Sequence, residues 1–173
     1  ITSTYILELA EKNGSLVVNR PASLRDNNEK MFITQFSQCC TPFLVSRDKS
    51  RLRNFVNERF QDEQQDVILK PHDGTGGASI YRVNPQDPNL SVILETVSEN
   101  ETRTVMAQQF IPEIAAGDKR VLLIDGEAVP FALARVPASG ETRGNLAAGG
   151  TGIGVELSER DQWICQQVGP VLK

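Results

Sequence analysis

The chain reads DVILKPHDGTGGASIYRV from Asp66 to Val83. Two short apolar runs, 67–69 and 80–83, are rich in β-branched residues, which predicts two strands joined as a hairpin. The glycines between them allow a positive φ and bring backbone amides close to an anion. We interpret this segment as a phosphate cover carried on a hairpin, with Lys70 entering from the first strand. The alternative is a flexible hairpin turn with a surface lysine.

Neither of the two standard phosphate-binding motifs describes this loop well. A Walker loop needs Gly-Lys-Ser/Thr after its glycines, and here Ala78 and Ser79 follow Gly77. The dinucleotide fingerprint opens a helix and has a third spaced glycine, whereas Ser79 occupies that place and a strand-like run follows. An anion site built on this loop therefore belongs to another class.

The composition is that of a globular protein and argues against several functions. The 173 residues, of which 39% are hydrophobic, suffice for the core of one domain or slightly more. A net charge of −4 without a basic stripe argues against nucleic acid as a partner. No apolar run reaches the roughly 18 residues of a membrane span, and we find no signal peptide. The cysteines at 39, 40 and 165 match no zinc spacing with His72, which favours reduced thiols in a cytoplasmic protein.

Apolar spacing and turn residues predict the remaining elements. Helices are expected at 1–10, 21–38, 48–60, 90–97 and 161–173. Strands are expected at 16–18, 42–45, 67–69, 80–83, 102–110, 118–125 and 128–136. Residues 137–154 are rich in glycine and poor in large side chains, which is typical of a long mobile loop. Hairpins set among helices favour an α+β fold with a largely antiparallel sheet.

With these elements in place, the chain resembles the ATP-grasp superfamily and, within it, the bacterial glutathione synthetases. The resemblance runs through nearly all 173 residues, and the string at 140–150 is its most specific part. The motifs that carry it are TYILE (4–8), VNRP (18–21), SLRD (23–26), NEK (28–30), ILKP (68–71), GTGGASI (74–80), GDKRV (117–121) and GETRGNLAAGG (140–150). In one departure, Thr151 stands where the family often has a basic residue.

The resemblance implies an ATP-grasp fold, mainly antiparallel with flanking helices, in a fragment of a longer protein. Residues 1–20 would end a preceding substrate or linker domain, and 21–173 would form an ATP-grasp domain that is incomplete at its C-terminus. Within it, 71–110 would be the lid subdomain hairpin and hinge, and 137–154 the flexible active-site loop. The N-terminal domain would precede Ile1, and the strands with the metal ligands would follow Lys173, so no metal ligand is expected within the chain.

The resemblance also implies an ATP-dependent ligase that needs Mg²⁺. It would join γ-glutamylcysteine to glycine through an acyl phosphate, giving glutathione, ADP and phosphate. The family analogy further suggests a cytoplasmic homo-oligomer whose partners are small molecules rather than nucleic acid or membrane. Two alternatives stay open: a ligase for another acid and amine, and a nucleotide-binding module without catalytic activity. The lid string at 140–150 argues against a ligase for another acid and amine, and a binding module would need no lid arginine.

Residue by residue, the resemblance implies a nucleotide site in four parts. The phosphates would be bound by the ammonium groups of Lys30 and Lys70, which act as point charges. The amides of Gly74, Thr75, Gly76 and Gly77 would close over them. The hinge that reads the adenine would comprise Gln108, Gln109, Phe110 and Ile111. Asp118 would accept hydrogen bonds from the ribose hydroxyls.

Four further side chains would act on the reacting groups. Arg120 and Arg135 are expected to project from neighbouring strands toward the dipeptide and acyl phosphate, since a guanidinium matches carboxylate and phosphate oxygens. For Arg135 the alternative is a structural charge at the edge of the sheet. Arg143 and Asn145 would belong to the lid, which excludes the water that hydrolyses the acyl phosphate.

Overall fold

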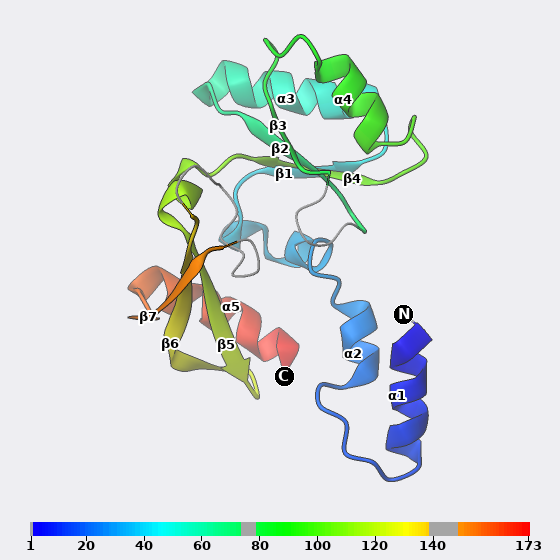
Figure 1. The fold of residues 1–173 in the computed structure, drawn as a ribbon, viewed down its shortest axis with the longest axis vertical. Coiled ribbons are helices and arrows are strands. Elements are labelled where there is room, and N and C mark those ends of the chain that lie inside the picture. The colour runs from blue at the N-terminus through cyan, green and yellow to red at the C-terminus, as the bar shows by residue number, and fades with distance from the viewer. Residues whose placement is uncertain (1, 74–78, 139–148) are drawn as a thin grey trace. The chain divides into compact units, whose positions relative to one another are not determined.

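The computed structural model describes residues 2–73, 79–138 and 149–173 (Figure 1). The chain divides into two compact units, Ile1–Ser37 and Gln38–Lys173. The boundary predicted after Arg20 therefore falls inside the first unit.

The first unit is built on two packed helices, α1 (Thr2–Lys12) and α2 (Pro21–Asp26). Arg25 of α2 joins them, because its guanidinium donates to Thr4 Oγ1 at 2.9 Å, pairs with Glu8 and lies 4.4 Å from the centroid of the Tyr5 ring. Two predictions were wrong in this part of the chain, the strand at 16–18 and the continuous helix over 21–38. The strand expected at 16–18 is absent, and its side chains at 16 and 18 are 91% and 82% exposed, so the run has no core to bury it.

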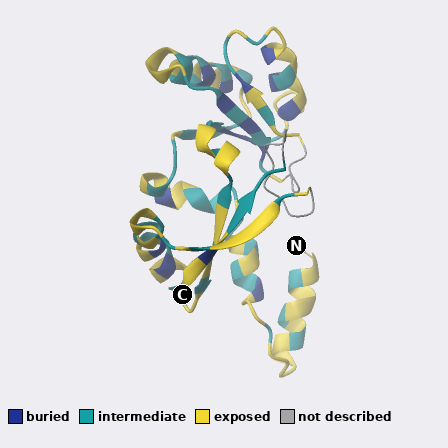
Figure 2. Cartoon of the chain, turned by 60° about the vertical axis from the view of Figure 1, so that its left-hand side comes forward, coloured by how far each residue is buried: buried dark blue, intermediate teal, exposed yellow. Residues whose placement is uncertain are grey.

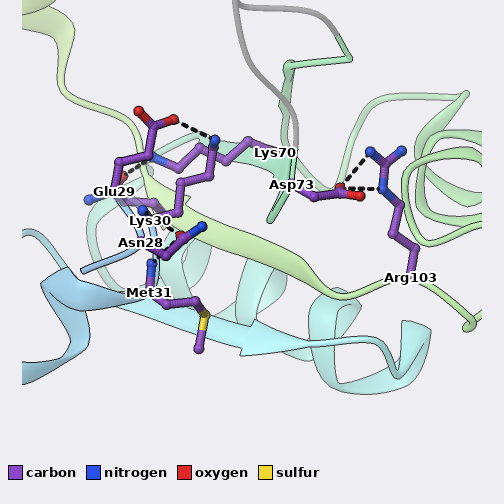
Figure 3. Close-up of polar contacts among 8 residues, drawn as sticks. Asn28, Glu29, Lys30, Met31, Lys70, Asp73 and Arg103 are labelled. Carbon is purple, nitrogen blue, oxygen red and sulfur yellow. Dashed lines mark hydrogen bonds and ion pairs between the residues drawn. The ribbon is translucent and has the colours of Figure 1, made fainter. Parts of the chain in front are cut away.

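The helix predicted over 21–38 is interrupted. Helix α2 ends at Asp26, and a 3₁₀ segment η1 (Phe32–Cys39) begins six residues later with a non-helical kink at Phe36. Between them, Asn28 Oδ1 accepts from the N–H groups of Lys30 and Met31 at 3.0 and 3.1 Å (Figure 3). This side-chain acceptor gives the backbone an alternative to helical hydrogen bonds, which explains the break.

The second unit contains a four-stranded sheet in the order β1-β4-β2-β3, with all neighbours antiparallel. Its strands are β1 (Phe43–Ser46), β2 (Val67–Pro71), β3 (Tyr81–Val83) and β4 (Val105–Gln109). Helices α3 (Lys49–Glu63) and α4 (Leu90–Val97) lie along one face (Figure 1). The predicted hairpin around residues 74–78 is confirmed by the pairing of β2 with β3.

A single apolar cluster holds the helices to this sheet. Alternate residues of β2 are buried, as expected for a strand with one covered face. The helices contribute residues at helical spacing, such as Leu90, Leu94 and Val97. The full cluster is Leu52, Val56, Val67, Leu69, Val83, Leu90, Leu94, Val97, Val105 and Ala107. Figure 2 shows buried residues gathered in this part of the chain.

The second unit also contains a three-stranded antiparallel sheet in the order β5-β6-β7. Strands β5 (Asp118–Ile124) and β6 (Glu127–Val136) form the predicted hairpin, with Asp125 and Gly126 both at positive φ in its turn. A 3₁₀ turn η2 (Pro112–Ala116) precedes it. Strand β7 (Thr151–Glu156) corrects the prediction that a loop extends to residue 154. Its two glycines lower its intrinsic strand propensity, and pairing with β6 supplies the order that the local pattern lacks.

Helix α5 (Glu159–Leu172) packs on one face of this second sheet. It begins with a capping box in which Ser158 and Asp161 exchange hydrogen bonds. The opposite face carries large apolar side chains that remain exposed, including Leu122 at 59% and Phe131 at 57%. The two antiparallel sheets with their flanking helices confirm the predicted α+β class. Within the described residues, no helix combines the length and the apolar character that crossing a membrane requires.

Candidate functional site

Lys70 lies on β2, on the face of the four-stranded sheet opposite to α3 and α4. Val67 and Leu69 point into the core with the helices, so Ile68 and Lys70 point the other way. The Lys70 Nζ donates to Oε1 of Gln108 over 2.8 Å. The strand register explains this contact. Gln108 lies opposite Ile68 on the adjacent strand β4, and Ile68 shares its face of the sheet with Lys70. The structure therefore brings the predicted phosphate lysine together with one predicted hinge residue.

The backbone after β4 offers one N–H group at the predicted adenine hinge. The Gln109 N–H donates to the Pro42 carbonyl and the Phe110 N–H to the Asp66 carbonyl, each at 2.9 Å. Within the described residues, the Ile111 N–H makes no hydrogen bond. The predicted reading of a base edge by the hinge backbone therefore rests on the donor of Ile111.

The side chains of the hinge diverge. The Gln109 side chain turns toward the end of α3, where its Nε2 donates to Glu63 Oε2 at 3.1 Å, so it does not join Lys70. The guanidinium of Arg82 covers one face of the Phe110 ring, with its central carbon 4.0 Å from the ring centroid. Ile111 is 45% exposed. Phe110 and Ile111 are thus the hinge residues with apolar surface available for a ligand.

Asp118 and Arg135 form a two-pronged ion pair across β5 and β6. The Arg135 Nε donates to Asp118 Oδ1 at 2.6 Å, and its Nη2 donates to Oδ2 at 2.5 Å. The two residues lie opposite each other in the register. The hydrogen bonds to Asp118 raise the pKa of Arg135 above its ordinary value. Arg135 lies on β6, the central strand of this sheet, so it is not at a sheet edge, and its pairing with Asp118 is a structural contact.

Arg120 lies two residues after Asp118 and shares its face of the sheet. It is exposed, and it makes no ion pair with any residue that the structure describes. Lys119 points to the other face, where it pairs with Asp161 of α5. The face opposite α5 therefore carries Asp118, Arg120 and Arg135, three of the predicted side chains, as one cluster.

Gly117 allows β5 to start so close to β6. It has φ +113, and a Cβ atom at this position would lie 2.6 Å from the carbonyl oxygen of Arg135. Any other residue would be strained there and would push against the strand that carries Arg135. The glycine of the GDKRV motif is thus explained by close backbone approach beside the ion pair.

Lys30 lies in the first unit, between α2 and η1. Its ammonium group pairs with Glu29 at 2.8 Å, and its backbone N–H donates to Asn28 Oδ1 (Figure 3). The remaining predicted site residues lie outside the described residues. They are Gly74, Thr75, Gly76, Gly77, Arg143 and Asn145.

The sequence interpretation missed two arginines, one beside a predicted hinge residue and one paired with the residue that precedes Gly74. Arg82 covers Phe110, and Arg103 pairs with Asp73, the last described residue before the glycine-rich segment. Alternation along β3 points Arg82 away from the core, which was a usable signal for an exposed arginine but not for its partner. No local pattern marked Arg103, because its partner lies 30 residues earlier in the chain.

Comparison with solved structures identifies the class of fold. The crystal structure of the D-cycloserine synthetase DcsG superposes with a TM-score of 0.66 at 14% identity, over 98% of this chain and 61% of that one. The ATP-grasp ligase PsnB, solved with its minimal precursor, Mg and ADP, superposes with a TM-score of 0.59 at 21% identity, over 99% of this chain and 50% of that one. At such identities the likeness defines the fold alone, which is that of the ATP-grasp proteins.

The sequence comparison narrows this class to one family. The family model described as prokaryotic glutathione synthetase, ATP-grasp domain, matches residues 29–173, and the chain belongs to this family. A glutathione synthetase of Pseudomonas aeruginosa is 59% identical over all 173 residues, which cover 53% of that protein. The chain thus spans about half the length of the curated relatives it matches.

Proposed function

We propose that the full-length protein is an ATP-dependent carboxylate–amine ligase, a glutathione synthase that joins γ-glutamylcysteine to glycine. The observation that carries the proposal is the family match over 29–173, together with 59% identity to a glutathione synthetase across the whole chain. From the resemblance alone, we further propose that the protein is a cytoplasmic homo-oligomer, and light scattering of the purified protein tests its oligomeric state.

In the proposed reaction, a carboxylate oxygen of the dipeptide attacks the γ-phosphorus of ATP. The bond from that phosphorus to the ADP oxygen breaks, and an acyl phosphate forms. The amine of glycine then attacks the acyl carbon, phosphate leaves with the electrons of the broken C–O bond, and the nitrogen loses a proton. Both steps put negative charge on phosphoryl oxygens, which fixed cations and backbone donors stabilise.

The four-stranded sheet supplies groups suited to the nucleotide. Lys70 would hold a phosphate, and its contact with the neutral amide of Gln108 is compatible with this role because an ammonium group carries three donors. The Ile111 N–H and the apolar surface of Phe110 and Ile111 would receive the base. Lys30 and the amides of residues 74–77 are proposed as further phosphate donors on the family resemblance.

The three-stranded sheet supplies groups suited to the sugar and the reacting oxygens. Each oxygen of Asp118 accepts one hydrogen bond from Arg135 and retains a lone pair for a ribose hydroxyl. Arg120, exposed on the same face, has its guanidinium available for an acyl phosphate or a substrate carboxylate. Arg143 and Asn145 are proposed as lid residues on the resemblance.

Magnesium is proposed as a cofactor, but not on ligands from the described residues. When bound, the ion would neutralise the negative charge that develops on the phosphoryl oxygens. The ligase PsnB was solved with Mg and ADP, which supports the metal for the fold class. Within the described part of this chain, no three His, Cys, Asp or Glu side chains are grouped to hold a metal ion. We therefore assign none of these residues to it.

The direct test is release of ADP by the full-length protein with Mg-ATP, adding γ-glutamylcysteine and glycine separately and then together. The proposal predicts sustained release only when both are present, with glutathione formed in equal amount. Release with a different acid or amine, but not with this pair, would replace the substrate assignment with another ATP-grasp ligase. ATP binding without turnover under all conditions would favour the nucleotide-binding module.

A further inference from the structure

Arg82 points from β3 toward the face of the four-stranded sheet that carries Lys70. Its neighbours Tyr81 and Val83 pack with the apolar cluster on the helix side, and successive residues of a strand point to opposite faces. The register places Arg82 opposite Ile68, which shares the face of Lys70. The guanidinium of Arg82 therefore lies on the same side of the sheet as the predicted nucleotide residues of β2 and β4.

Phe110 is the residue that receives this guanidinium. It follows β4 directly, and its N–H donates at 2.9 Å to the carbonyl of Asp66, the residue before β2. The central carbon of the Arg82 guanidinium lies 4.0 Å from the centroid of the Phe110 ring, within the range of a cation–π contact. The Phe110 side chain stays partly exposed. A cation thus covers one face of the hinge aromatic ring, and the ring keeps surface for a ligand.

Asp66 holds both partners of this contact. Its carbonyl fixes the backbone of Phe110, while its Oδ2 accepts from the Arg82 Nε at 2.6 Å. The other carboxylate oxygen, Oδ1, accepts from Asn84 Nδ2 at 3.1 Å. The Asp66 side chain is 18% exposed. One largely buried residue therefore fixes the Phe110 backbone and also the cation that lies on the Phe110 ring.

The same end of the sheet carries the donor available at the predicted hinge. Within the described residues the N–H of Ile111, next to Phe110, makes no hydrogen bond. Lys70 follows Asp66 by four strand positions, which separates their Cα atoms by roughly 13 Å. A nucleotide with a phosphate at Lys70 would extend along the sheet and place its base at Phe110. The base and the phosphates then depend on different side chains, which can be tested separately.

We propose that Arg82 is a positioning residue for the nucleotide base, which acts by fixing the Phe110 ring against which the base packs. The inference rests on the proposed function, in which the hinge receives the adenine. An aromatic side chain that is already held in one orientation loses less conformational freedom when a base packs on it, which strengthens binding. In this assignment Arg82 acts through Phe110 and does not contact the phosphates.

The contact is open to water, which limits the size of the effect. The Arg82 side chain is 56% exposed. An exposed cation–π contact corresponds to about twofold to fivefold in affinity, so we expect Arg82→Ala to raise the Kd for ATP by about this factor. Salt at 0.15 M screens exposed charges over about 8 Å, so the Kd for inorganic triphosphate, which has no base, should stay nearly unchanged.

The experiment measures the Kd for ATP and for inorganic triphosphate by calorimetry, on the full-length protein in the presence of Mg²⁺. Arg82→Ala should weaken the binding of ATP and not that of triphosphate. Phe110→Leu should do the same, and adding Arg82→Ala to it should cause no further loss, because both residues act through one ring. Arg82→Lys keeps the charge without the planar guanidinium, so it should recover part of the loss.

Arg160→Ala is the matched control. This exposed arginine also lies over an aromatic ring, 4.2 Å from the centroid of Trp163, but it belongs to α5. Its Kd for ATP should equal that of the wild type. Melting temperatures without nucleotide show whether each variant is folded.

Four outcomes would overturn the inference. They are an unchanged Kd for ATP in folded Arg82→Ala, an equal loss for ATP and inorganic triphosphate, a further loss when Arg82→Ala is added to Phe110→Leu, and a loss in Arg160→Ala equal to that in Arg82→Ala. A wild-type protein that binds ATP but makes no glutathione would refute the proposed ligase, while the Kd comparison still decides the role of Arg82. A wild type that binds no ATP would refute both.

Discussion

Arg135 shows how one contact changes the role expected of a side chain. The sequence interpretation directed it toward the acyl phosphate, but its guanidinium is engaged by both oxygens of Asp118. We expect Arg135→Lys to raise the KM for ATP by about tenfold, because a lysine cannot make the paired contact and a hydrogen bond to a charged group contributes about 1.5 kcal/mol or more. Steady-state kinetics with each substrate varied in turn measure this. A raised KM for the dipeptide with an unchanged KM for ATP would instead support direct contact with the acyl group.

Gly117 offers a second test beside the same pair. Replacing it with alanine puts a Cβ 2.6 Å from the Arg135 carbonyl at φ +113, and we expect a loss of about 1–3 kcal/mol in the free energy of unfolding. Gly154→Ala is the control, because a Cβ there meets nothing within 4 Å. Urea denaturation of both variants decides the matter, and equal losses would show that the close approach at Gly117 is unimportant.

The start of helix α5 should make stability depend on acid. Burial raises the pKa of Asp161, but hydrogen bonds from Lys119 and Ser158 outweigh it, and the pKa lies below the ordinary 3.8. A depressed pKa stabilises the fold at pH values above the unfolded-state pKa, and this contribution is lost as the pH falls through the folded-state value. Asp161→Asn should therefore destabilise the protein at pH 7, and the difference from wild type should shrink as the pH falls below 3.8.

Chemical denaturation across this pH range measures the effect of Asp161. Asp125→Asn is the matched control, because Asp125 pairs with Lys173 at 3.3 Å with both side chains more than half exposed. Its effect on the free energy of unfolding should stay within about 0.5 kcal/mol at every pH. A difference between wild type and Asp161→Asn that persists unchanged into acid would contradict the role assigned to this carboxylate.

For the molecule as a whole, nucleotide binding should appear as stability. A ligand present at about 100 times its Kd raises the free energy of unfolding by about 2.7 kcal/mol. We expect ATP to raise the melting temperature of the full-length wild type and of Lys49→Ala, whose ammonium group pairs with Glu95 at 3.7 Å. Lys70→Ala should lose most of this increase. Calorimetric melting with and without ATP provides the measurement, and an undiminished increase in Lys70→Ala would remove the phosphate assignment.

The predicted elements succeeded where a side-chain period extended over several residues. The helix at 90–97 was predicted to the residue because its apolar positions repeat at helical spacing, and the hairpin at 118–136 because a turn signal separates two strand-like runs. The strand at 16–18 failed because a three-residue run has no strand partner in the unit that contains it. Strand β7 was missed for the opposite reason, since its order comes from β6 and not from its own composition.

The residues of the candidate site show the same contrast between local patterns and long-range contacts. The hairpin motif pointed to Lys70 and the family resemblance to Asp118 and Arg120, and these assignments stay predictions. The α+β class with its antiparallel hairpins could be inferred from period and turns, because both are properties of neighbouring residues. The partners could not be inferred: Lys70 with Gln108, Arg135 with Asp118, and Arg103 with Asp73. These pairs were settled by strand register and by the packing of loops against helices, which join atoms separated by 17 to 38 residues of chain. Contacts over that range depend on how the folded backbone closes on itself, and no local pattern encodes it.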